Sequence, residues 1–440
     1  MLDQQTALTR PLNRRTFIMA GTAAVAAFLT SCGSSGGSSG SATLQFWGGV
    51  PAESGPKALI DAFHKKYPNI KVTYTRFVND DQGNVKLDTA LASGSRVDVY
   101  MSYSPALMTR RIDSGLAVDL ASYIDADSEV KSWMGSTSGI FQYKNKYWGL
   151  PIAKGPSYVF INKNMIEDAG ITLPTDWTVD EFREIARKLS KNGVYGTFDT
   201  PDLAYATLGA DDAYKNGGKE SNYDDDVWRK SLQLHSDMIK EKSAFPWTEV
   251  LAQNLRVYAQ GIFLKGQVGM AINSDFWHRY ITDTKNYPHD FVTTFMPIPK
   301  PVGVSDPYTV GGLNNWIQIN AKTKNRDAAW TFLRFNLGEG AKYMIPSGRN
   351  PAFPGTSDDD VIKGLLGANR EKLYDVDAYR RVVLQTKFKL MLPTISTAAA
   401  ELAKIQQSEI DRYLVGEISL DQCINDMKQQ ADDAIKKAGA

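Results

Sequence analysis

Residues 139–189 read GIFQYKNKYWGLPIAKGPSYVFINKNMIEDAGITLPTDWTVDEFREIARKL. The stretch opens with a hairpin pattern, because Tyr143 and the pair Tyr147 and Trp148 flank the polar turn 144–146. A Gly-Pro loop then leads into an apolar strand at 158–161, and two amphipathic helical segments follow it. This order of strand and helix signals predicts a unit in which helices pack on a sheet.

The chain before this stretch alternates in the same way. Residues 43–48, 70–77 and 97–101 have strand patterns, and residues 57–66 and 84–92 between them have helical patterns. Such alternation is typical of a parallel, doubly wound α/β sheet. Because 440 residues exceed what one ordinary core accommodates, two lobes are expected.

The composition excludes several classes of protein. Apolar residues make up 42% and charged residues 22% of the chain, as in soluble globular proteins. The net charge of +1 includes +2 from residues 1–31, so the remainder carries about −1 and has no field that would attract nucleic acid. The two cysteines, Cys32 and Cys423, form neither a disulfide framework nor a thiolate zinc site. Cys423, on an apolar helix face, is expected to be a small buried hydrophobe.

The N-terminus has the pattern of an export signal followed by an anchor. Arg14 and Arg15 precede an apolar run at 17–30, which has the length of a signal-peptide core and is too short to span a bilayer. The run ends in Leu29-Thr30-Ser31-Cys32, a lipobox pattern. We therefore predict a signal peptide at 1–31, and lipidated Cys32 with a Gly/Ser-rich flexible tether at 32–42. The arginine pair leaves export by the Tat or the Sec route open.

Six segments spread over residues 43–440 carry a resemblance to a known family. They occupy residues 63–72, 93–99, 113–124, 139–189, 260–277 and 325–335. In this order they resemble the family 1 extracellular solute-binding proteins, the maltose-binding-protein-like carbohydrate receptors of ABC importers. The resemblance implies an α/β, two-lobed periplasmic-binding-protein type II fold with three hinge crossings and a ligand cleft between the lobes.

The family's crossings are expected near 153–155, 269–272 and 335–338 of this chain. That gives an N-lobe of 43–153 plus 272–335 and a C-lobe of 156–270 plus 338–440.

Candidate ligand-binding residues follow strands or lie at the expected crossings, since ligands of open α/β sheets bind beyond the carboxyl ends of the strands. A sugar needs aromatic rings against its apolar faces and planar polar groups for its hydroxyls. The candidates are Trp47, Tyr103, Lys154, Tyr158, Trp247, Asp275, Trp277, Asn314, Trp316 and Arg349. Three other tryptophans, Trp148, Trp177 and Trp330, are expected to be scaffold residues.

One departure from the maltose-type pattern affects specificity. The helix expected at 397–407 contains no aromatic residue, whereas relatives of the maltose type offer rings to the sugar there. This departure weakens the transfer of maltodextrin specificity to this chain, and Trp247 is the proposed substitute ring.

The function predicted is binding of an extracellular sugar, an oligosaccharide, and its delivery to an ABC permease. No enzyme motif is present: the chain lacks Gly-x-Ser-x-Gly, His-Glu-x-x-His and a Walker loop, and its four histidines are scattered. No catalytic residue, cofactor or metal site is expected, and the protein is expected to be an exported, membrane-anchored monomer facing outside. The alternatives are a receptor for a polyamine, metal or peptide on the same fold, and a surface glycosidase or adhesin.

Overall fold

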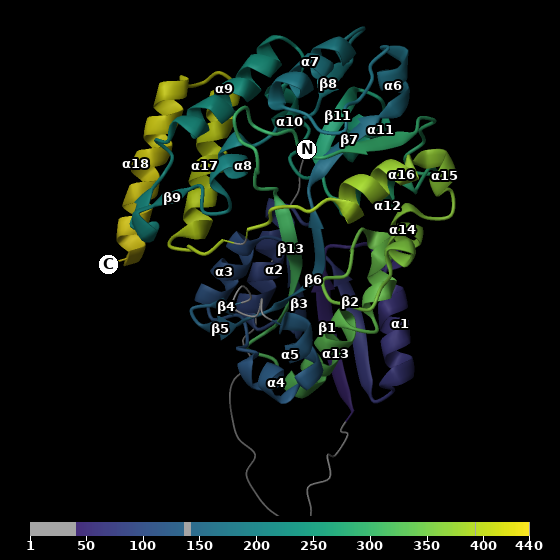
Figure 1. The fold of residues 1–440 in the computed structure, drawn as a ribbon. Coiled ribbons are helices and arrows are strands. Elements are labelled where there is room, and N and C mark those ends of the chain that lie inside the picture. The colour runs from purple at the N-terminus through teal and green to yellow at the C-terminus, as the bar shows by residue number, and fades with distance from the viewer. Residues whose placement is uncertain (1–40, 136–141, 392, 440) are drawn as a thin grey trace, which may run out of the picture. The chain divides into compact units, whose positions relative to one another are not determined.

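The computed structural model describes residues 41–135, 142–391 and 393–439. The predicted signal peptide, Cys32 and the tether up to residue 40 lie outside the described residues. Within residues 41–439 the strands form two main sheets, each covered by helices and each with its own hydrophobic core (Figure 1).

The N-lobe is built on a five-stranded sheet with the order β2-β1-β3-β13-β6. Its strands are β1 (Ala42–Gly48), β2 (Ile70–Arg76), β3 (Val99–Ser102), β6 (Leu150–Pro156) and β13 (Gly311–Ile319). β1 is parallel to β2 and β3, as the alternating pattern predicted, and β13 is antiparallel to β3 and β6.

Helices cover both faces of this sheet. They are η1 (Ala52–Ser54), α1 (Pro56–Lys66), α2 (Asp81–Ser93), α3 (Pro105–Asp113), α4 (Ala121–Ala126), α5 (Ser128–Met134), α13 (Arg326–Leu337) and η5 (Ala341–Ser347). Polar caps fix where two of them begin, because Asp80 accepts from Gly83 N and Ser104 accepts from Leu107 N. One core contains Phe63 and Phe332, and a smaller cluster under α2 contains Leu87.

The C-lobe is built on a four-stranded sheet with the order β12-β7-β11-β8. Its strands are β7 (Tyr158–Asn162), β8 (Tyr195–Thr197), β11 (Val268–Asn273) and β12 (Thr293–Met296). Its helices are α6 (Lys163–Asp168), α7 (Val179–Leu189), α8 (Leu203–Leu208), α9 (Asp226–Lys240), α10 (Trp247–Ala252), α11 (Gln260–Leu264), η4 (Asp275–Trp277), α12 (His278–Ile281), α14 (Asp358–Leu366), α15 (Arg370–Leu373), α16 (Val376–Tyr379), the π-helical turn η6 (Arg380–Gln385), α17 (Ala399–Leu414) and α18 (Leu420–Gly439).

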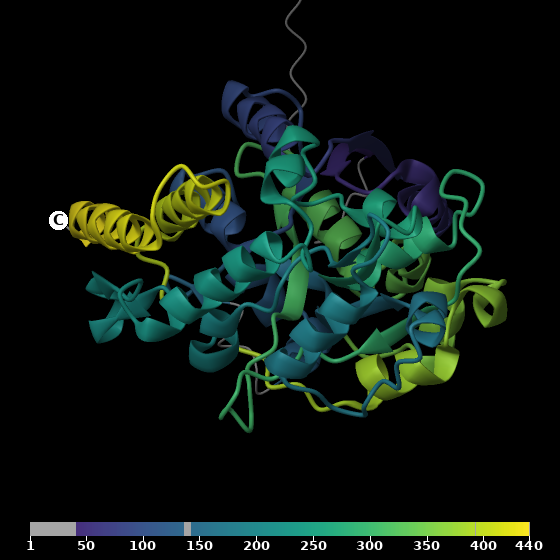
Figure 2. The ribbon, with the colours of Figure 1, turned by 90° about the horizontal axis from the view of Figure 1, so that it is seen from above.

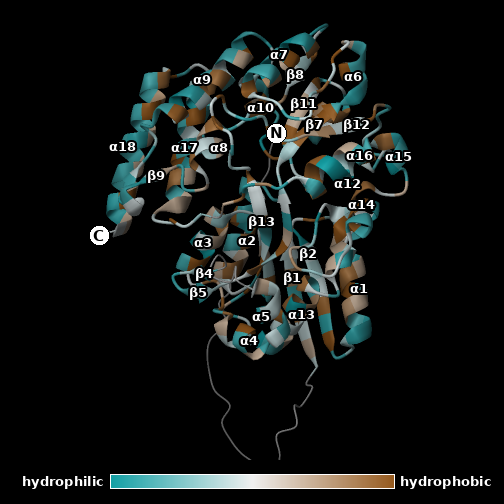
Figure 3. Ribbon diagram, viewed as in Figure 1, coloured by the Kyte–Doolittle hydropathy of each residue, from teal (hydrophilic) through white to brown (hydrophobic). Residues whose placement is uncertain are grey.

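The last two helices lie side by side and pack on α9 (Figure 2). Their shared core contains Trp228, Leu402 and Met427, and it also buries Cys423, so the prediction of a small buried hydrophobe is confirmed. Figure 3 shows α18 carrying hydrophilic residues beside hydrophobic ones, as expected of a helix with one buried face. Two short hairpins complete the fold: β4 (Gln142–Tyr143) with β5 (Lys146–Tyr147), and β9 (Tyr214–Lys215) with β10 (Glu220–Ser221) around the short turn η3 (Asn216–Gly218).

Local predictions in the opening stretch are confirmed. The hairpin β4–β5 turns through Lys144 and Asn145, whose φ angles of 52° and 58° suit a tight hairpin turn. At the start of α7, Thr178 and Glu181 form a reciprocal capping box. Trp177 is 2% exposed and packs in the core beneath α7. This segment is therefore scaffold, apart from the residues of β6.

The first passage between the sheets lies just beyond the residues at which it was expected, 153–155. β6 belongs to the N-lobe sheet up to Pro156, and β7 begins in the C-lobe sheet at Tyr158.

The second predicted passage, at 269–272, is wrong with respect to the sheets. β11 pairs with β7 and β8, and β12 pairs with β7, so residues 268–296 stay in the C-lobe. The chain returns to the N-lobe only where β13 begins at Gly311.

The third predicted passage, at 335–338, comes too early. Residues 326–337 form α13, and Met344 and Phe353 beyond it still pack in the N-lobe core. Val361 of α14 packs in the C-lobe core. The chain therefore crosses between residues 353 and 361. The glycine at 338, where the crossing was expected, only ends α13.

The first two passages are hydrogen-bonded to each other. β6 and β13 pair along their length, with Gly311 opposite Pro156 and Gly312 opposite Gly155. Gly311 and Gly312 have φ angles of 129° and 100°, and a Cβ atom on Gly311 would lie 2.4 Å from the Gly155 carbonyl oxygen. Only glycine allows this close approach.

In the part of the chain that the structure describes, no helix is both long and apolar enough to cross a membrane.

Candidate functional site

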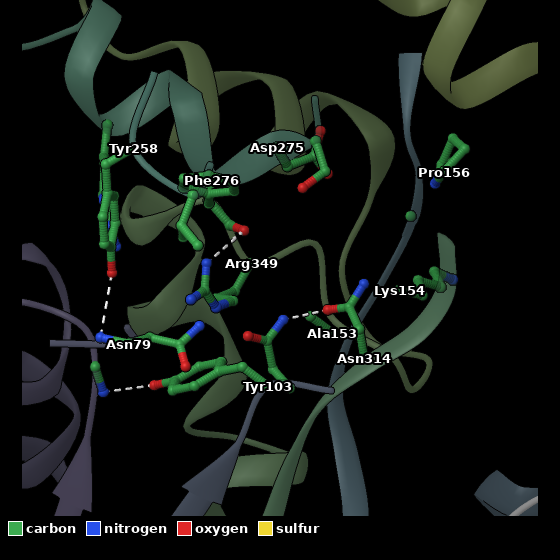
Figure 4. A pocket seen from close by; sticks show the side chains of 17 residues that line it. Asn79, Tyr103, Ala153, Lys154, Pro156, Tyr258, Asp275, Phe276, Asn314 and Arg349 are labelled. Carbon is green, nitrogen blue, oxygen red and sulfur yellow. Dashed lines mark hydrogen bonds between the residues drawn. The ribbon is translucent and has the colours of Figure 1, made fainter. Parts of the chain in front are cut away.

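A cavity lies between the two lobes and takes its walls from both (Figure 4). The residues from the N-lobe are Gly49, Asn79, Tyr103, Ala153, Lys154, Gly155, Pro156, Asn314 and Asn315. Those from the C-lobe are Val257, Tyr258, Ser274, Asp275, Phe276 and Arg279. The last two, Gly348 and Arg349, come from the loop that follows η5. The walls therefore combine aromatic rings with amide, carboxylate and guanidinium groups.

Asp275 is the acidic side chain among these lining residues. It begins η4 directly after β11, and its side chain is 7% exposed. Its Oδ1 accepts hydrogen bonds from the hydroxyls of Tyr158 (2.7 Å) and Tyr379 (3.1 Å), while its Oδ2 has no partner among the described residues. Burial raises the pKa of Asp275 to about 6, against the opposing effect of the two tyrosine hydroxyls. A fixed carboxylate thus presents a free oxygen near the cavity.

A buried polar cluster behind Asp275 holds it in place. The Tyr158 hydroxyl lies 2.7 Å from His278 Nε2 and donates its own proton to Asp275, so it accepts the proton on Nε2. Burial lowers the pKa of His278 to about 3, which keeps the imidazole neutral. Tyr158, which was predicted to bind the ligand, therefore positions Asp275 and does not itself line the cavity.

Arg349 enters the cavity from the loop after η5. It is 6% exposed, and its Nη1 donates to the carbonyl oxygens of Ser347 (3.0 Å) and Gly348 (3.1 Å). Burial is the main cause that lowers the pKa of Arg349, and its guanidinium carbon lies 5.9 Å from the centre of the Tyr103 ring. Gly348 has a φ of 80°, and a Cβ there would lie 2.3 Å from Phe276 Cα. Glycine is required for the arginine loop to approach η4 this closely.

Three rings line the cavity: Tyr103, Tyr258 and Phe276. The Tyr103 hydroxyl accepts a hydrogen bond from Gly49 N at 2.6 Å. The Tyr258 hydroxyl accepts one from Asn79 N at 3.2 Å, which joins the C-lobe to the N-lobe (Figure 4). Each tyrosine ring is thus held by a polar contact at its edge, and all three rings offer apolar carbon to the cavity.

Two consecutive asparagines of β13 reach the cavity. Neighbouring strand residues ordinarily point to opposite faces, but Asn315 has a φ of 57°, which interrupts the alternation. The amide groups of Asn314 and Asn315 are hydrogen-bonded to each other. A left-handed residue inside a strand is uncommon outside functional sites.

Five of the ten predicted residues line this cavity. They are Tyr103, Lys154, Asp275, Asn314 and Arg349. Their contact with a ligand stays a prediction, while the structure brings them to one place.

Three predicted tryptophans lie elsewhere. Trp277 is fully buried against Phe160 and Phe263, because the turn η4 directs it into the C-lobe core and leaves Phe276 at the cavity. Trp316 is buried in the N-lobe core. Trp47 packs beside the cluster under α2, with Lys86 Nζ 5.9 Å from its ring centre. These positions correct the expectation that the three face the cleft.

Trp247 lines a second cavity, between α10 and α17. Its Nε1 donates to Asp411 Oδ1 at 2.9 Å, and Asp411 also pairs with Arg256. The helix α17 contributes Gln406 and Gln407 to the same cavity and no aromatic ring. Trp247 is therefore separate from the cavity that holds Asp275.

Asn79, Tyr258, Phe276, Arg279 and Asn315 also line the cavity, and none of them was predicted from the sequence. Asn79 and Tyr258 lie in loops without a strand pattern, so no periodicity points to them. Phe276 lies between the predicted residues Asp275 and Trp277. The rotation of the short turn η4 about its axis decides whether the ring of Phe276 or that of Trp277 faces the cavity. Among the described residues, no group of three or more His, Cys, Asp or Glu side chains is placed to hold a metal ion.

Comparison with known proteins places this geometry in a family. Residues 48–343 match the model of the bacterial extracellular solute-binding proteins. An uncharacterized ABC transporter extracellular-binding protein of Pyrococcus horikoshii is 23% identical over 269 residues, 57% of this chain and 58% of that protein. The arabinooligosaccharide-binding protein of Bacillus subtilis is 26% identical over 227 residues, 48% of this chain and 51% of that protein. The chain thus matches a little over half the length of these two relatives.

A solved structure supports the fold over nearly the whole chain. The ABC substrate-binding protein of Listeria monocytogenes in complex with cycloalternan superimposes with a TM-score of 0.73 at 20% identity. The superposition covers 90% of this chain and 99% of that one. With the family model covering more than half of the sequence, this chain belongs to the bacterial extracellular solute-binding proteins.

Proposed function

We propose that this solute-binding protein captures a sugar, specifically an oligosaccharide, and delivers it to the membrane subunits of an ABC permease. The observation that carries the proposal is the interlobe cavity, in which three rings stand among amide, carboxylate and guanidinium groups. Rings suit the apolar faces of a pyranose, and the planar polar groups suit pairs of neighbouring hydroxyls. The sugar ligands named for related proteins agree with this choice.

Asp275 and Asn314 would set which hydroxyls are accepted. A buried polar group left unmatched costs about 1–3 kcal/mol, so a ligand lacking a hydroxyl at the Asp275 Oδ2 position binds more weakly. Phe276 would replace Trp277 as the ring that the sugar contacts from the C-lobe. Tyr103 would supply a ring from the N-lobe.

Closure would follow from the position of the ligand between the lobes. A ligand that touches both lobes binds the closed form better and shifts the population toward it. Moving the ratio of closed to open protein from 1:99 to 99:1 requires about 5.5 kcal/mol of differential affinity. The passages at 156–158, 309–311 and 353–361 are the segments proposed to bend.

Two other functions are less well supported. A polyamine or metal ligand would require several carboxylates, but the cavity has Asp275 beside Lys154, Arg279 and Arg349. A retaining or inverting glycosidase uses a pair of carboxylic acids, and the lining residues include one. Turnover of an oligosaccharide that ceases in an Asp275→Ala variant would support the enzyme instead.

The anchoring of the protein belongs to the same proposal. Cleavage before Cys32 and acylation of its sulfur would hold a monomeric receptor on the outer side of the cell membrane, with residues 33–42 as tether. Mass spectrometry of the membrane fraction tests this, because a Cys32→Ser variant should lose the acyl mass and appear in the soluble fraction.

A thermal-shift screen against a panel of oligosaccharides tests the binding function. A ligand at 100 times its Kd adds about 2.7 kcal/mol to the free energy of unfolding, which raises the melting temperature measurably. Small-angle scattering with the best ligand should show a smaller radius of gyration. A panel without any stabilising carbohydrate would refute the sugar assignment, and a binding sugar without compaction would refute closure.

A further inference from the structure

Two arginines of the cavity form no ion pair with a carboxylate among the described residues, although the charge of Arg349 acts on Asp275 from beyond ion-pair distance. Arg349 and Arg279 both line the cavity, and neither is within 4 Å of an Asp or Glu oxygen among the described residues. The Nε atoms of both are buried and lack a hydrogen-bond partner in the same part of the chain. A buried cation without a counter-ion is costly, and such a group is strongly stabilised once an anion reaches it.

The remaining contacts of the two guanidinium groups fix their orientation without neutralising them. Arg279 donates to the Tyr280 hydroxyl at 2.6 Å and stacks on the Tyr280 ring at 4.6 Å. Arg349 donates to two backbone carbonyls of its own loop and lies over Tyr103. A stacked and oriented guanidinium is pre-organised for a planar or tetrahedral oxyanion.

The charged side chains that line the cavity carry a net positive charge. Lys154, Arg279 and Arg349 stand against Asp275 among the lining residues. The positive charge of Arg279 also contributes to the lowered pKa of Arg349, so the two cations interact across the site. Elsewhere in the described chain, arginines such as Arg111, Arg183 and Arg334 are matched by carboxylates. Unlike those three, Arg279 and Arg349 form no ion pair among the described residues, and their Nε atoms are buried.

From the unpaired guanidinium groups of Arg279 and Arg349 we infer that the ligand is an acidic sugar, whose anionic group binds between these two side chains. The anionic group is an oxyanion, either the carboxylate of a uronic acid or a phosphate ester. Asp275 Oδ2 would then accept from a hydroxyl of the same sugar, away from the anion. The inference rests on the proposed function and narrows its ligand class.

The test is calorimetric titration of the purified protein with matched pairs of ligands. One arm compares di- and trigalacturonate with the same oligosaccharides after reduction of the carboxylates to hydroxymethyl groups. A second arm compares hexose 6-phosphates with the free hexoses. We expect the acidic member of at least one pair to bind at least ~10-fold more tightly, as a charge-assisted hydrogen bond allows. This preference should shrink when the salt concentration rises from 0.05 to 0.5 M.

Variants separate the arginines from the rest of the cavity. Arg279→Gln and Arg349→Gln should each reduce affinity for the preferred acidic ligand at least ~10-fold more than they reduce affinity for its neutral partner, because only the acidic ligand loses a charge-assisted hydrogen bond. Arg229→Gln is the matched control, since Arg229 of α9 lies outside the cavity lining and pairs with Asp421 of α18. If Arg349→Gln does not fold, the Arg279→Gln variant, whose side chain is only half-buried, and the comparison of acidic with neutral ligands on the wild-type protein still test the inference.

The outcomes distinguish this inference from the function on which it rests. A preference in the uronate arm assigns a carboxylate, and one in the phosphate arm assigns a phosphate ester. Neutral sugars that bind as tightly as their acidic partners overturn the inference and leave the sugar-binding function standing. Absence of binding by every carbohydrate, acidic or neutral, in this test and in the thermal screen overturns both.

Discussion

Replacing Asp275 by Asn is expected to stabilise the protein and to weaken ligand binding at the same time. The carboxyl has a pKa of about 6 in the folded protein against an ordinary value of 3.8. At about 1.36 kcal/mol per pKa unit, the difference means that ionised Asp275 costs roughly 3 kcal/mol of folding free energy. Because this pKa is raised, the cost is absent below about pH 4 and complete above pH 6. Asn keeps an acceptor oxygen for the hydroxyls of Tyr158 and Tyr379.

The size of the effect is measurable. At about 2.1 cal/mol/K per residue over roughly 400 residues, 3 kcal/mol corresponds to a rise in melting temperature of roughly 3–4 °C at pH 8. The gain should vanish at pH 4, where the wild-type carboxyl is protonated. Affinity for the ligand should fall about 10–100-fold at pH 8, since a hydrogen bond to a charged acceptor is lost.

The assay is differential scanning fluorimetry from pH 4 to 8, followed by calorimetric titration at pH 8. Asp433→Asn is the matched control, because Asp433 is exposed on α18 and should change neither quantity. A variant that melts below the wild type at pH 8, or that gains equally at pH 4, would refute the argument that Asp275 is ionised at a cost. Unchanged affinity would refute its role in the cavity.

Two further predictions concern the neighbours of Asp275. Gly348→Ala should lower the free energy of unfolding by about 2–4 kcal/mol and abolish binding, because its Cβ would lie 2.3 Å from Phe276 Cα. Gly94→Ala is the control, since Gly94 has a similar φ of 77° and no atom within 4 Å of the added Cβ. This control variant should lose only the free energy of the backbone strain. Urea unfolding of both variants measures the difference, and equal losses would show that the contact with η4 is unimportant. His278, whose pKa burial lowers to about 3, should contribute a loss of stability as the pH falls from 6.5 toward 3, because the unfolded histidine takes up a proton that the folded one refuses. This contribution is opposite in sign to that of Asp275 over the same range. A His278→Gln variant should show a smaller loss between pH 7 and 4 in the same experiment, and an unaltered pH dependence would contradict a neutral, buried imidazole.

The fold was largely predictable because alternating strands and helices leave a strong periodic signal. The first passage was found where an apolar strand follows a Gly-Pro pair. The second was placed at 269–272, which lies inside β11, and Gly269 there serves packing, since its Cβ would lie 2.8 Å from Leu189 Cδ1. A glycine in a central strand and a glycine in a hinge are indistinguishable in one sequence.

The site was predictable in part, for a different physical reason. Asp275 and Asn314 follow or begin strands, and topology alone directs such residues toward a cleft. The choice between Trp277 and Phe276 depends on the rotation of one short turn, which the sequence pattern does not determine. Tyr258 and Asn79 come from loops that only the packing of the two lobes brings together. Prediction from strand ends therefore succeeds for Tyr103, Asp275 and Asn314 and fails for Trp47, which lies at the end of β1 but packs beside the cluster under α2.

The pairing of β6 with β13 has a mechanical consequence. Two of the three passages form one two-stranded ribbon, tied across Gly155, Gly312 and their neighbours. Sliding one strand along the other would break the register of these hydrogen bonds, whereas flexing both together keeps it. The ribbon should therefore confine the lobes to a swing about a single axis, so that the cavity opens like a book and does not swivel.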